Sequence, residues 1–332
     1  MRVLLTGGNG FVGSHILEGL LRQGHEVTLL LRESSDTDLI RDALAQARVV
    51  RGDVQSAESL APAVSDVEAV IHCAGKTKAV RQSEYAAVNT QGTQNLVDAC
   101  SAHGGKLQRF ILISSLTVSG PGTSQGPARE DAAPRPVTPY GRSKMLAEEC
   151  VRTRCRVPYA ILRPAAVYGP GDRDFLVAFK SVANGVAPLI KGGKQRLNTI
   201  YASDVAQAVM LALAGGGAAG GIYHLAHPMP LTHREMLEEI ARAMGRKPLY
   251  VPVPALVLYP VFAVRGLASR LTSTPSVMNL QKIPEYTAPG WVCSTARAAQ
   301  ELGFTARVPF EEGAGRTLQW YVKNGWLKEV AR

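Results

Sequence analysis

The chain has 332 residues, of which 46% are hydrophobic and 19% charged, a composition typical of a globular protein with a substantial core. No run of about 18 apolar residues occurs, so we expect no membrane-spanning helix and no stable membrane insertion. The net charge of +10 is dispersed, without long basic runs or interleaved aromatic residues, and we therefore expect no nucleic-acid partner.

The cysteine and histidine patterns predict neither disulfides nor a metal site. The five cysteines contain no C-x-x-C pair, so reduced thiols are expected. His224, His227 and His233 are close in the sequence, but no carboxylate or thiolate completes a ligand set, and no metal is expected. Because Met1 runs directly into an apolar strand and a glycine loop, without room for a signal peptide, we expect a cytoplasmic protein.

The first half of the chain alternates short apolar runs with helical patterns. Apolar runs without polar alternation are typical of strands buried on both faces of a parallel sheet. The expected strands are residues 2–6, 26–31, 47–51, 69–73, 109–114 and 159–162. The expected helices are residues 14–23, 84–102 and 140–154. This order predicts a doubly wound α/β Rossmann sheet with right-handed crossovers.

The second half mixes helical patterns with proline-rich connections. Helices are expected over residues 203–214, 233–244, 294–302 and 310–323, and a long surface loop over residues 120–139. We expect residues 1–170 to form an NAD(P)-binding domain. Residues 171–332 would form a smaller, mixed α/β substrate-binding region, with residues 198–226 returning to the nucleotide domain.

The segment from Thr6 to Gly13 has the pattern of a dinucleotide-binding turn. Gly7 allows a tight turn, Gly10 lets the backbone approach a pyrophosphate, and Gly13 lets the helix pack closely on the strand. The helix start supplies free N–H groups and a partial positive charge for the phosphates. The strand–loop–helix context favours this function over a flexible turn. Phe11 and Val12 belong to the same predicted contact set.

The end of the second expected strand bears on the choice of cofactor. Enzymes of this fold that use NAD place a carboxylate there, whereas this chain has Leu31 and Arg32. Arg32 can pair with a 2′-phosphate, which predicts NADP with NAD still possible; a plain surface charge is the alternative. Asp53 follows the third strand and could accept from adenine or cap the next helix. The further residues expected beside the cofactor are Val54, Ala74, Gly75 and Lys76.

Tyr140 and Lys144 are four residues apart at the start of an expected helix, so their side chains share one face. An unperturbed tyrosine titrates near pH about 10, and we expect the Lys144 ammonium to stabilise the phenolate and lower the Tyr140 pKa. Tyr140 could then exchange a proton with a carbonyl or alcohol oxygen, and Lys144 would reach the nicotinamide ribose. The spacing also recurs by chance, and the alternative is a half-buried core tyrosine. Ser115 could hold the substrate oxygen, because strand alternation favours it over Ser114.

These motifs together resemble the extended short-chain dehydrogenase/reductase superfamily, also called the NAD-dependent epimerase/dehydratase family. The resemblance covers nearly the whole chain and rests on residues 6–13, 52–54, 89–93, 114–115, 140–144, 162–171 and 201–206. It implies that the catalytic hydroxyl lies three residues before Val118, which is Ser115. It also implies a possible homodimer. The residues that it implies beside the cofactor are Asn89, Pro164, Ala165 and Val167.

Two departures from the family pattern bear on the substrate. Leu197 and Asn198 stand where nucleotide-sugar enzymes carry a diphosphate-binding Arg-Asp pair, and Leu31 takes the acidic NAD position. The chain is more similar to the 3β-hydroxysteroid dehydrogenase and dihydroflavonol reductase branch. We therefore predict an NADP-dependent enzyme that interconverts a ketone and a secondary alcohol on a small, largely apolar substrate. The alternatives are a nucleotide-sugar epimerase or dehydratase with tightly bound NAD, and a non-catalytic dinucleotide sensor.

Residues 250–268 are too apolar for a solvated loop and, with three prolines, too interrupted for a plain helix. Placed over the ends of the strands, they could wall an apolar substrate pocket. Packing on the sheet, a dimer contact and a membrane-surface contact are the alternatives.

Overall fold

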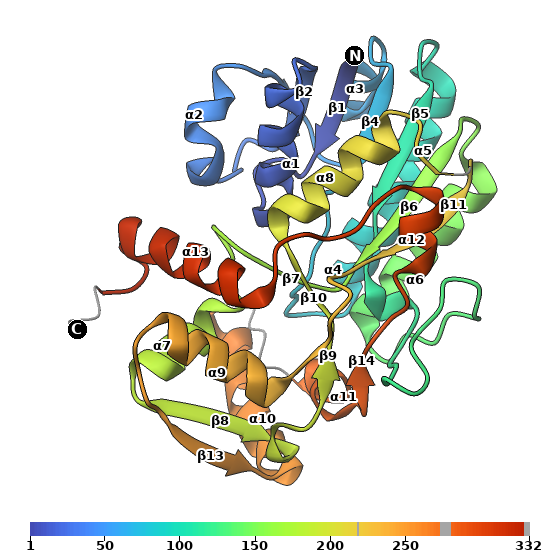
Figure 1. Ribbon diagram of the computed structural model, residues 1–332. Helices are drawn as coiled ribbons and strands as arrows, with labels where there is room; N and C mark the ends of the chain where they lie inside the picture. The colour runs from blue at the N-terminus through green and yellow to red at the C-terminus, as the bar shows by residue number, and fades with distance from the viewer. Residues whose placement is uncertain (218, 273–279, 329–332) are drawn as a thin grey trace.

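The computed structural model describes residues 1–217, 219–272 and 280–328, with the backbone alone for residues 267–272. A seven-stranded parallel sheet of order β11-β6-β5-β4-β1-β2-β3 forms the larger part of the molecule (Figure 1). The predicted doubly wound α/β fold is confirmed. The strands are β1 (Arg2–Thr6), β2 (Glu26–Leu31), β3 (Arg48–Arg51), β4 (Ala69–His72), β5 (Arg109–Ile113), β6 (Tyr159–Pro164) and β11 (Gly221–Leu225).

Helices cover both faces of this sheet. Ile16, Leu17 and Leu20 form the buried stripe of α1, which packs beside α8 on one face, while α3, α5 and α6 cover the other. Apolar side chains at helical spacing explain this packing, because each helix must remove one stripe from water. The helices are α1 (Phe11–Arg22), α2 (Arg41–Leu44), α3 (Ala61–Val64), α5 (Gly92–His103), α6 (Pro139–Arg154), α8 (Ala202–Leu213) and α12 (Ala296–Glu301).

The remaining elements form a smaller region beyond the carboxyl ends of the strands (Figure 1). Its core is aromatic and aliphatic, with Tyr168, Phe179, Leu237 and Tyr321 nearly fully buried. Its strands are β7 (Ala166–Tyr168), β8 (Val186–Ile190), β9 (Arg196–Leu197), β10 (Thr199–Tyr201), β12 (Leu231–Thr232), β13 (Leu249–Val253) and β14 (Gly290–Trp291). Its helices are α7 (Leu176–Ala183), α9 (His233–Ala243), α10 (Ala255–Thr272), α11 (Ile283–Thr287) and α13 (Phe310–Lys323).

The helix expected over residues 84–102 is interrupted. It consists of α4 (Ser83–Tyr85), a π-helical stretch (Ala86–Gln91) and α5. The Asn89 side chain accepts from the Lys76 backbone N–H at 2.7 Å and donates to the Lys76 carbonyl at 3.0 Å. These two hydrogen bonds hold Asn89, within the π-helical stretch, against the loop after β4. The periodicity of apolar residues does not reveal such a stretch.

Residues 250–268 also differ from the expectation, because most of them form the continuous helix α10 with Pro260 inside it. Pro260 is exposed, so the backbone acceptor that it leaves unpaired can turn to water. Leu258 and Phe262 lie one turn apart and pack on Ile283, which holds the helix on the molecule. No helix in the described part of the chain is long and apolar enough to cross a membrane.

A buried ion pair joins α6 to β6. Arg163 donates to both carboxylate oxygens of Glu148, at 2.9 and 2.6 Å, and the two side chains are 2% and 3% exposed. Ser114, directly after β5, also donates to Glu148. Arg163 donates from its remaining terminal nitrogen to the Ser119 hydroxyl at 3.0 Å. The pair therefore ties α6, β5 and β6 together inside the protein.

Replacing Glu148 by Gln should destabilise the protein by about 3–5 kcal/mol, because the Arg163 charge would remain buried without its counter-charge. Urea unfolding at neutral pH measures this loss. Asp98→Asn is the matched control: its pair with Arg154, at 2.9 Å, is about half exposed. That change should cost roughly 0–1 kcal/mol. Equal losses in the two variants would contradict the prediction.

Candidate active site

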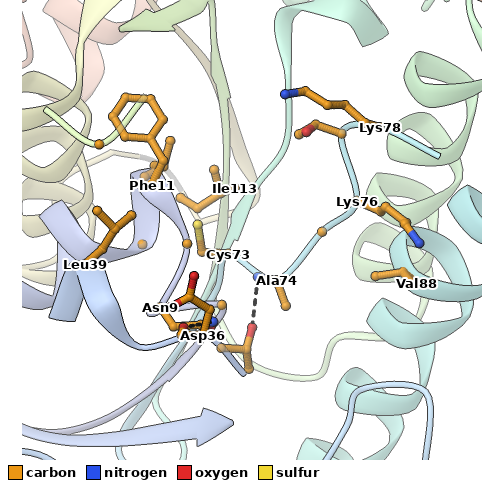
Figure 2. Close-up of a pocket in the computed structure, with 18 of the residues that line it drawn as sticks. Asn9, Phe11, Asp36, Leu39, Cys73, Ala74, Lys76, Lys78, Val88 and Ile113 are labelled. Carbon is orange, nitrogen blue, oxygen red and sulfur yellow. Dashed lines mark hydrogen bonds between the residues drawn. The ribbon is translucent and has the colours of Figure 1, made fainter. Parts of the chain in front are cut away.

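A cavity of about 1450 Å³ opens at the carboxyl ends of β1, β4 and β5. Figure 2 shows Phe11 and Leu39 on one side of this cavity and Lys76, Lys78 and Val88 on the other. Nearly all the residues selected from the sequence line it. They are Gly7, Gly10, Phe11, Val12, Gly13, Arg32, Asp53, Val54, Ala74, Gly75, Lys76, Ser115, Tyr140, Lys144, Pro164, Ala165 and Val167.

Asn89 is the exception, because it does not line the cavity and is only 1% exposed. Besides its bonds to Lys76, its amide nitrogen donates to the Ser143 hydroxyl at 2.8 Å. Asn89 thus connects the loop after β4 to helix α6. This side chain is turned into the packed interior, and its expected contact with the cofactor stays a prediction.

The glycine turn after β1 brings backbone into close contact. Gly7 has φ +70°, and a Cβ atom on it would lie 2.6 Å from the Ala74 backbone nitrogen. A Cβ atom on Gly13 would lie 2.0 Å from the Gly7 carbonyl oxygen. Side chains are excluded at both positions, so α1 begins directly at the turn with its free N–H groups facing the cavity. A dinucleotide pyrophosphate fits this arrangement.

Arg32 lies at the far end of the cavity, beyond β2. Its backbone N–H donates to the Ser35 hydroxyl at 3.0 Å, and no described carboxylate forms an ion pair with its guanidinium. Leu31 is 1% exposed and packs in the core. Asp53 accepts from the Gln55 backbone at 2.9 Å; it does not cap the next helix, whose N-cap is Ser56.

Ser115 and Tyr140 both line the opposite end of the cavity, where the Ser115 hydroxyl is close enough to lower the pKa of the Tyr140 phenol. Ser115 Oγ accepts from both the backbone N–H and the hydroxyl of Thr117, at 3.2 and 2.9 Å, which leaves its own proton for Tyr140. Ser114 instead faces Glu148 in the core. Lys144 donates from Nζ to the Ile113 carbonyl oxygen at 2.6 Å.

The electrostatics of this pair differ from the expectation. Burial raises the pKa of Tyr140 above its ordinary value, and the hydrogen bond from Ser115 offsets this only in part. Burial also lowers the pKa of Lys144 to about 8. The prediction of a lowered tyrosine pKa is therefore wrong for this structure, because the loss of hydration is the largest effect on the phenol. The phenol is consequently protonated at neutral pH, which is the form that a proton donor requires.

Sequence reasoning did not find Lys282, which lies just before α11 and also lines the cavity. Its ammonium is 5.0 Å from the centre of the Tyr140 ring and 2.9 Å from a Glu285 carboxylate oxygen. The other Glu285 oxygen accepts from the Thr138 hydroxyl at 2.9 Å. Thr138 is the N-cap of α6, and its hydroxyl accepts from the Gly141 N–H at 3.2 Å. Of these residues, only Thr138 has a signal in the sequence, because threonine directly before a helix start is a typical N-cap.

The chain is similar to known proteins over its whole length. It is 30% identical to a ceramide reductase of Caulobacter vibrioides, covering 98% of this chain and 96% of the relative. It is 29% identical to a 2-alkyl-3-oxoalkanoate reductase of Stenotrophomonas maltophilia, covering 95% and 98%. A dTDP-glucose 4,6-dehydratase of Streptomyces venezuelae, solved with NAD bound, is 25% identical with a TM-score of 0.80, and each chain is covered to 100%.

The family model for the NAD dependent epimerase/dehydratase family matches residues 3–226. This range contains the glycine turn, Ser115, Tyr140 and Lys144. The family expected from the sequence motifs is confirmed, and the chain belongs to the NAD dependent epimerase/dehydratase family of enzymes.

Proposed function

We propose that this protein is an NADP-dependent oxidoreductase that interconverts a ketone and a secondary alcohol on a largely apolar substrate. The observation that carries the proposal is that Ser115 and Tyr140 line one cavity beside buried Lys144. This group shares one cavity with the glycine turn of Gly7 and Gly13.

A dinucleotide held along the turn of Gly7 and Gly13 would supply the hydride for reduction of the carbonyl carbon. Ser115 holds the carbonyl oxygen with its hydroxyl, and Tyr140 Oη gives that oxygen its proton. Tyr140 is then left as a buried phenolate, which the Lys144 ammonium stabilises. Oxidation of the alcohol reverses each transfer, with Tyr140 accepting the proton.

Two observations support a substrate other than a nucleotide sugar. Two of the curated relatives are named as reductases, one of ceramide and one of a 2-alkyl-3-oxoalkanoate. In addition, Asn198 donates to the His227 carbonyl at 2.7 Å and accepts from the Cys293 N–H at 2.9 Å, so it serves the packing of loops. Neither Leu197 nor Asn198 lines the cavity. No described residue of the segment 250–268 lines the cavity either. The interpretation of these described residues as a pocket wall is therefore wrong.

A nucleotide-sugar epimerase or dehydratase with tightly bound NAD is the second candidate. It is favoured by the likeness to the dTDP-glucose dehydratase and by Lys78, Arg173 and Lys282, whose cations line the cavity. The retained Tyr140 and Lys144 argue against a non-catalytic sensor. A homodimer and a cytoplasmic location remain predictions.

Tyr140→Phe and Lys144→Ala should each abolish turnover. The Phe variant should keep its cofactor affinity, because only the proton-donating hydroxyl is lost. Steady-state rates and a fluorescence titration of the reduced cofactor measure both effects. Tyr250→Phe is the control. Tyr250 does not line the cavity, so this variant should keep the wild-type rate. If Tyr140→Phe retained more than about a tenth of the wild-type rate, Tyr140 would not be the proton donor.

The protein should prefer NADPH to NADH by about tenfold or more, the value of one charge-assisted phosphate contact. Arg32→Ala should remove this preference, while Arg48→Ala, outside the cavity, should keep it. Asp36 and Asp38 line the same cavity as Arg32, and their negative charges would oppose binding of the 2′-phosphate. Titration of both cofactors decides the matter; equal affinities in the wild type would contradict the assignment.

NADPH oxidation should proceed with apolar ketones and not with nucleotide-diphosphate sugars. A panel of steroid-like, polyketide and acyl ketones measures turnover, and calorimetry measures binding of the sugar nucleotides. Purified protein should also exchange added cofactor freely. Micromolar binding of a sugar nucleotide, together with retained NAD and no ketone turnover, would instead establish the epimerase candidate.

A further inference from the structure

Helix α10 and strand β13 turn large apolar side chains outward. Leu256 is 80% exposed, and Leu249 and Val264 are each 69% exposed. We call these residues, with four neighbours, the α10 surface: Leu249, Val251, Leu256, Val257, Tyr259, Val261 and Val264. Half of the large hydrophobic side chains exposed in the described structure belong to it. A concentration of exposed apolar side chains of this kind marks an interaction site.

The way α10 packs explains why so much of it is exposed. Among its described side chains, only Leu258 and Phe262 are buried, and these lie one turn apart on a single narrow stripe. The stripe packs on Ile283 and Tyr286, next to Lys282 of the cavity wall. An apolar helix is normally covered on more than one stripe. Figure 1 shows α10 beside β8 and β13, at the end of the molecule away from α2 and α3.

The charged residues in the sequence segment that forms this surface all have one sign. No Asp or Glu occurs between Glu239 and Glu285. Arg246 and Lys247, directly before β13, and Arg265 on α10 are exposed. Within the described part of the chain, none of these three cations forms an ion pair; the nearby pairs are Arg242–Glu239 and Lys282–Glu285.

This combination selects one partner among those that could cover an apolar face. A second copy of the chain, related by a two-fold axis, would bring the same cations together without compensating carboxylates. An anionic lipid surface accommodates both features, because the apolar side chains enter the acyl boundary and the cations meet the headgroups. Tyr259, with its apolar ring and polar hydroxyl, suits that boundary.

We propose that the α10 surface docks this protein on an anionic bilayer, with α10 lying in the plane of the interface. One packed layer, formed by Leu258, Phe262, Ile283 and Tyr286, then separates the bilayer from the segment that carries Lys282. Docking would place the cavity close to molecules dissolved in the membrane. The inference does not depend on the proposed reaction, because vesicle binding is measured without turnover.

Vesicle co-sedimentation of the purified chain tests the proposal. The wild type should bind vesicles of mixed phosphatidylglycerol and phosphatidylcholine, and less so at high salt. The double variant Leu256→Gln/Val264→Gln should bind about tenfold or more weakly, because two apolar side chains no longer enter the boundary. Met229→Gln is the matched control: Met229 is 68% exposed outside the α10 surface, and its loss should leave binding unchanged.

The charge contribution is tested separately. Arg246→Glu should weaken binding to the mixed vesicles by about fivefold or more, with little effect on vesicles of phosphatidylcholine alone. Thermal unfolding by circular dichroism and cofactor titration establish that each variant is folded.

The proposal would be overturned if the wild type did not bind anionic vesicles. It would also be overturned if the double variant and Met229→Gln lost vesicle binding to the same extent. Sedimentation velocity covers the remaining alternative. A dimer that dissociates in Leu256→Gln/Val264→Gln, without vesicle binding by the wild type, would assign the surface to a second copy.

Discussion

The buried ion pair between Glu148 and Arg163 fixes the helix that carries Tyr140 and Lys144 against the central sheet. Both charges are removed from water, so each depends on the hydrogen bonds of the other to replace its lost hydration. Glu148 is one turn beyond Lys144 on α6, Arg163 lies on β6, and Ser114 follows β5. Because the three elements meet at one carboxylate, the residues at their ends converge on the same cavity.

Burial also governs the acid–base chemistry of Tyr140 and Lys144. Tyr140 and Lys144 share a helix face, yet hydration lost on burial displaces both pKa values toward the neutral forms. A neutral phenol suits the donation of a proton to a carbonyl oxygen, and Ser115 is oriented by two bonds from Thr117 to assist. The cation matters after the transfer, when the phenolate must be stabilised.

The C-terminal region connects the cavity to the outer surface. Lys282 and Glu285 reach the cap of α6 at Thr138, so the segment before β14 touches the start of the helix that carries Tyr140. On its other side the same segment receives Leu258 and Phe262 of α10. The exposed helix α10 is therefore joined to the candidate catalytic tyrosine through the segment that carries Lys282 and Ile283.

The sequence by itself determined the parallel sheet, the turn from Gly7 to Gly13 and the common face of Tyr140 and Lys144. Each follows from local rules: apolar runs bury strands, positive φ requires glycine, and four residues make one helical turn. Only the tertiary structure decided that Asn89 faces the interior and that Lys282 stands over the Tyr140 ring. It also decided that α10 exposes its apolar side chains. These features depend on contacts between segments far apart in the chain and on burial, neither of which periodicity or spacing encodes.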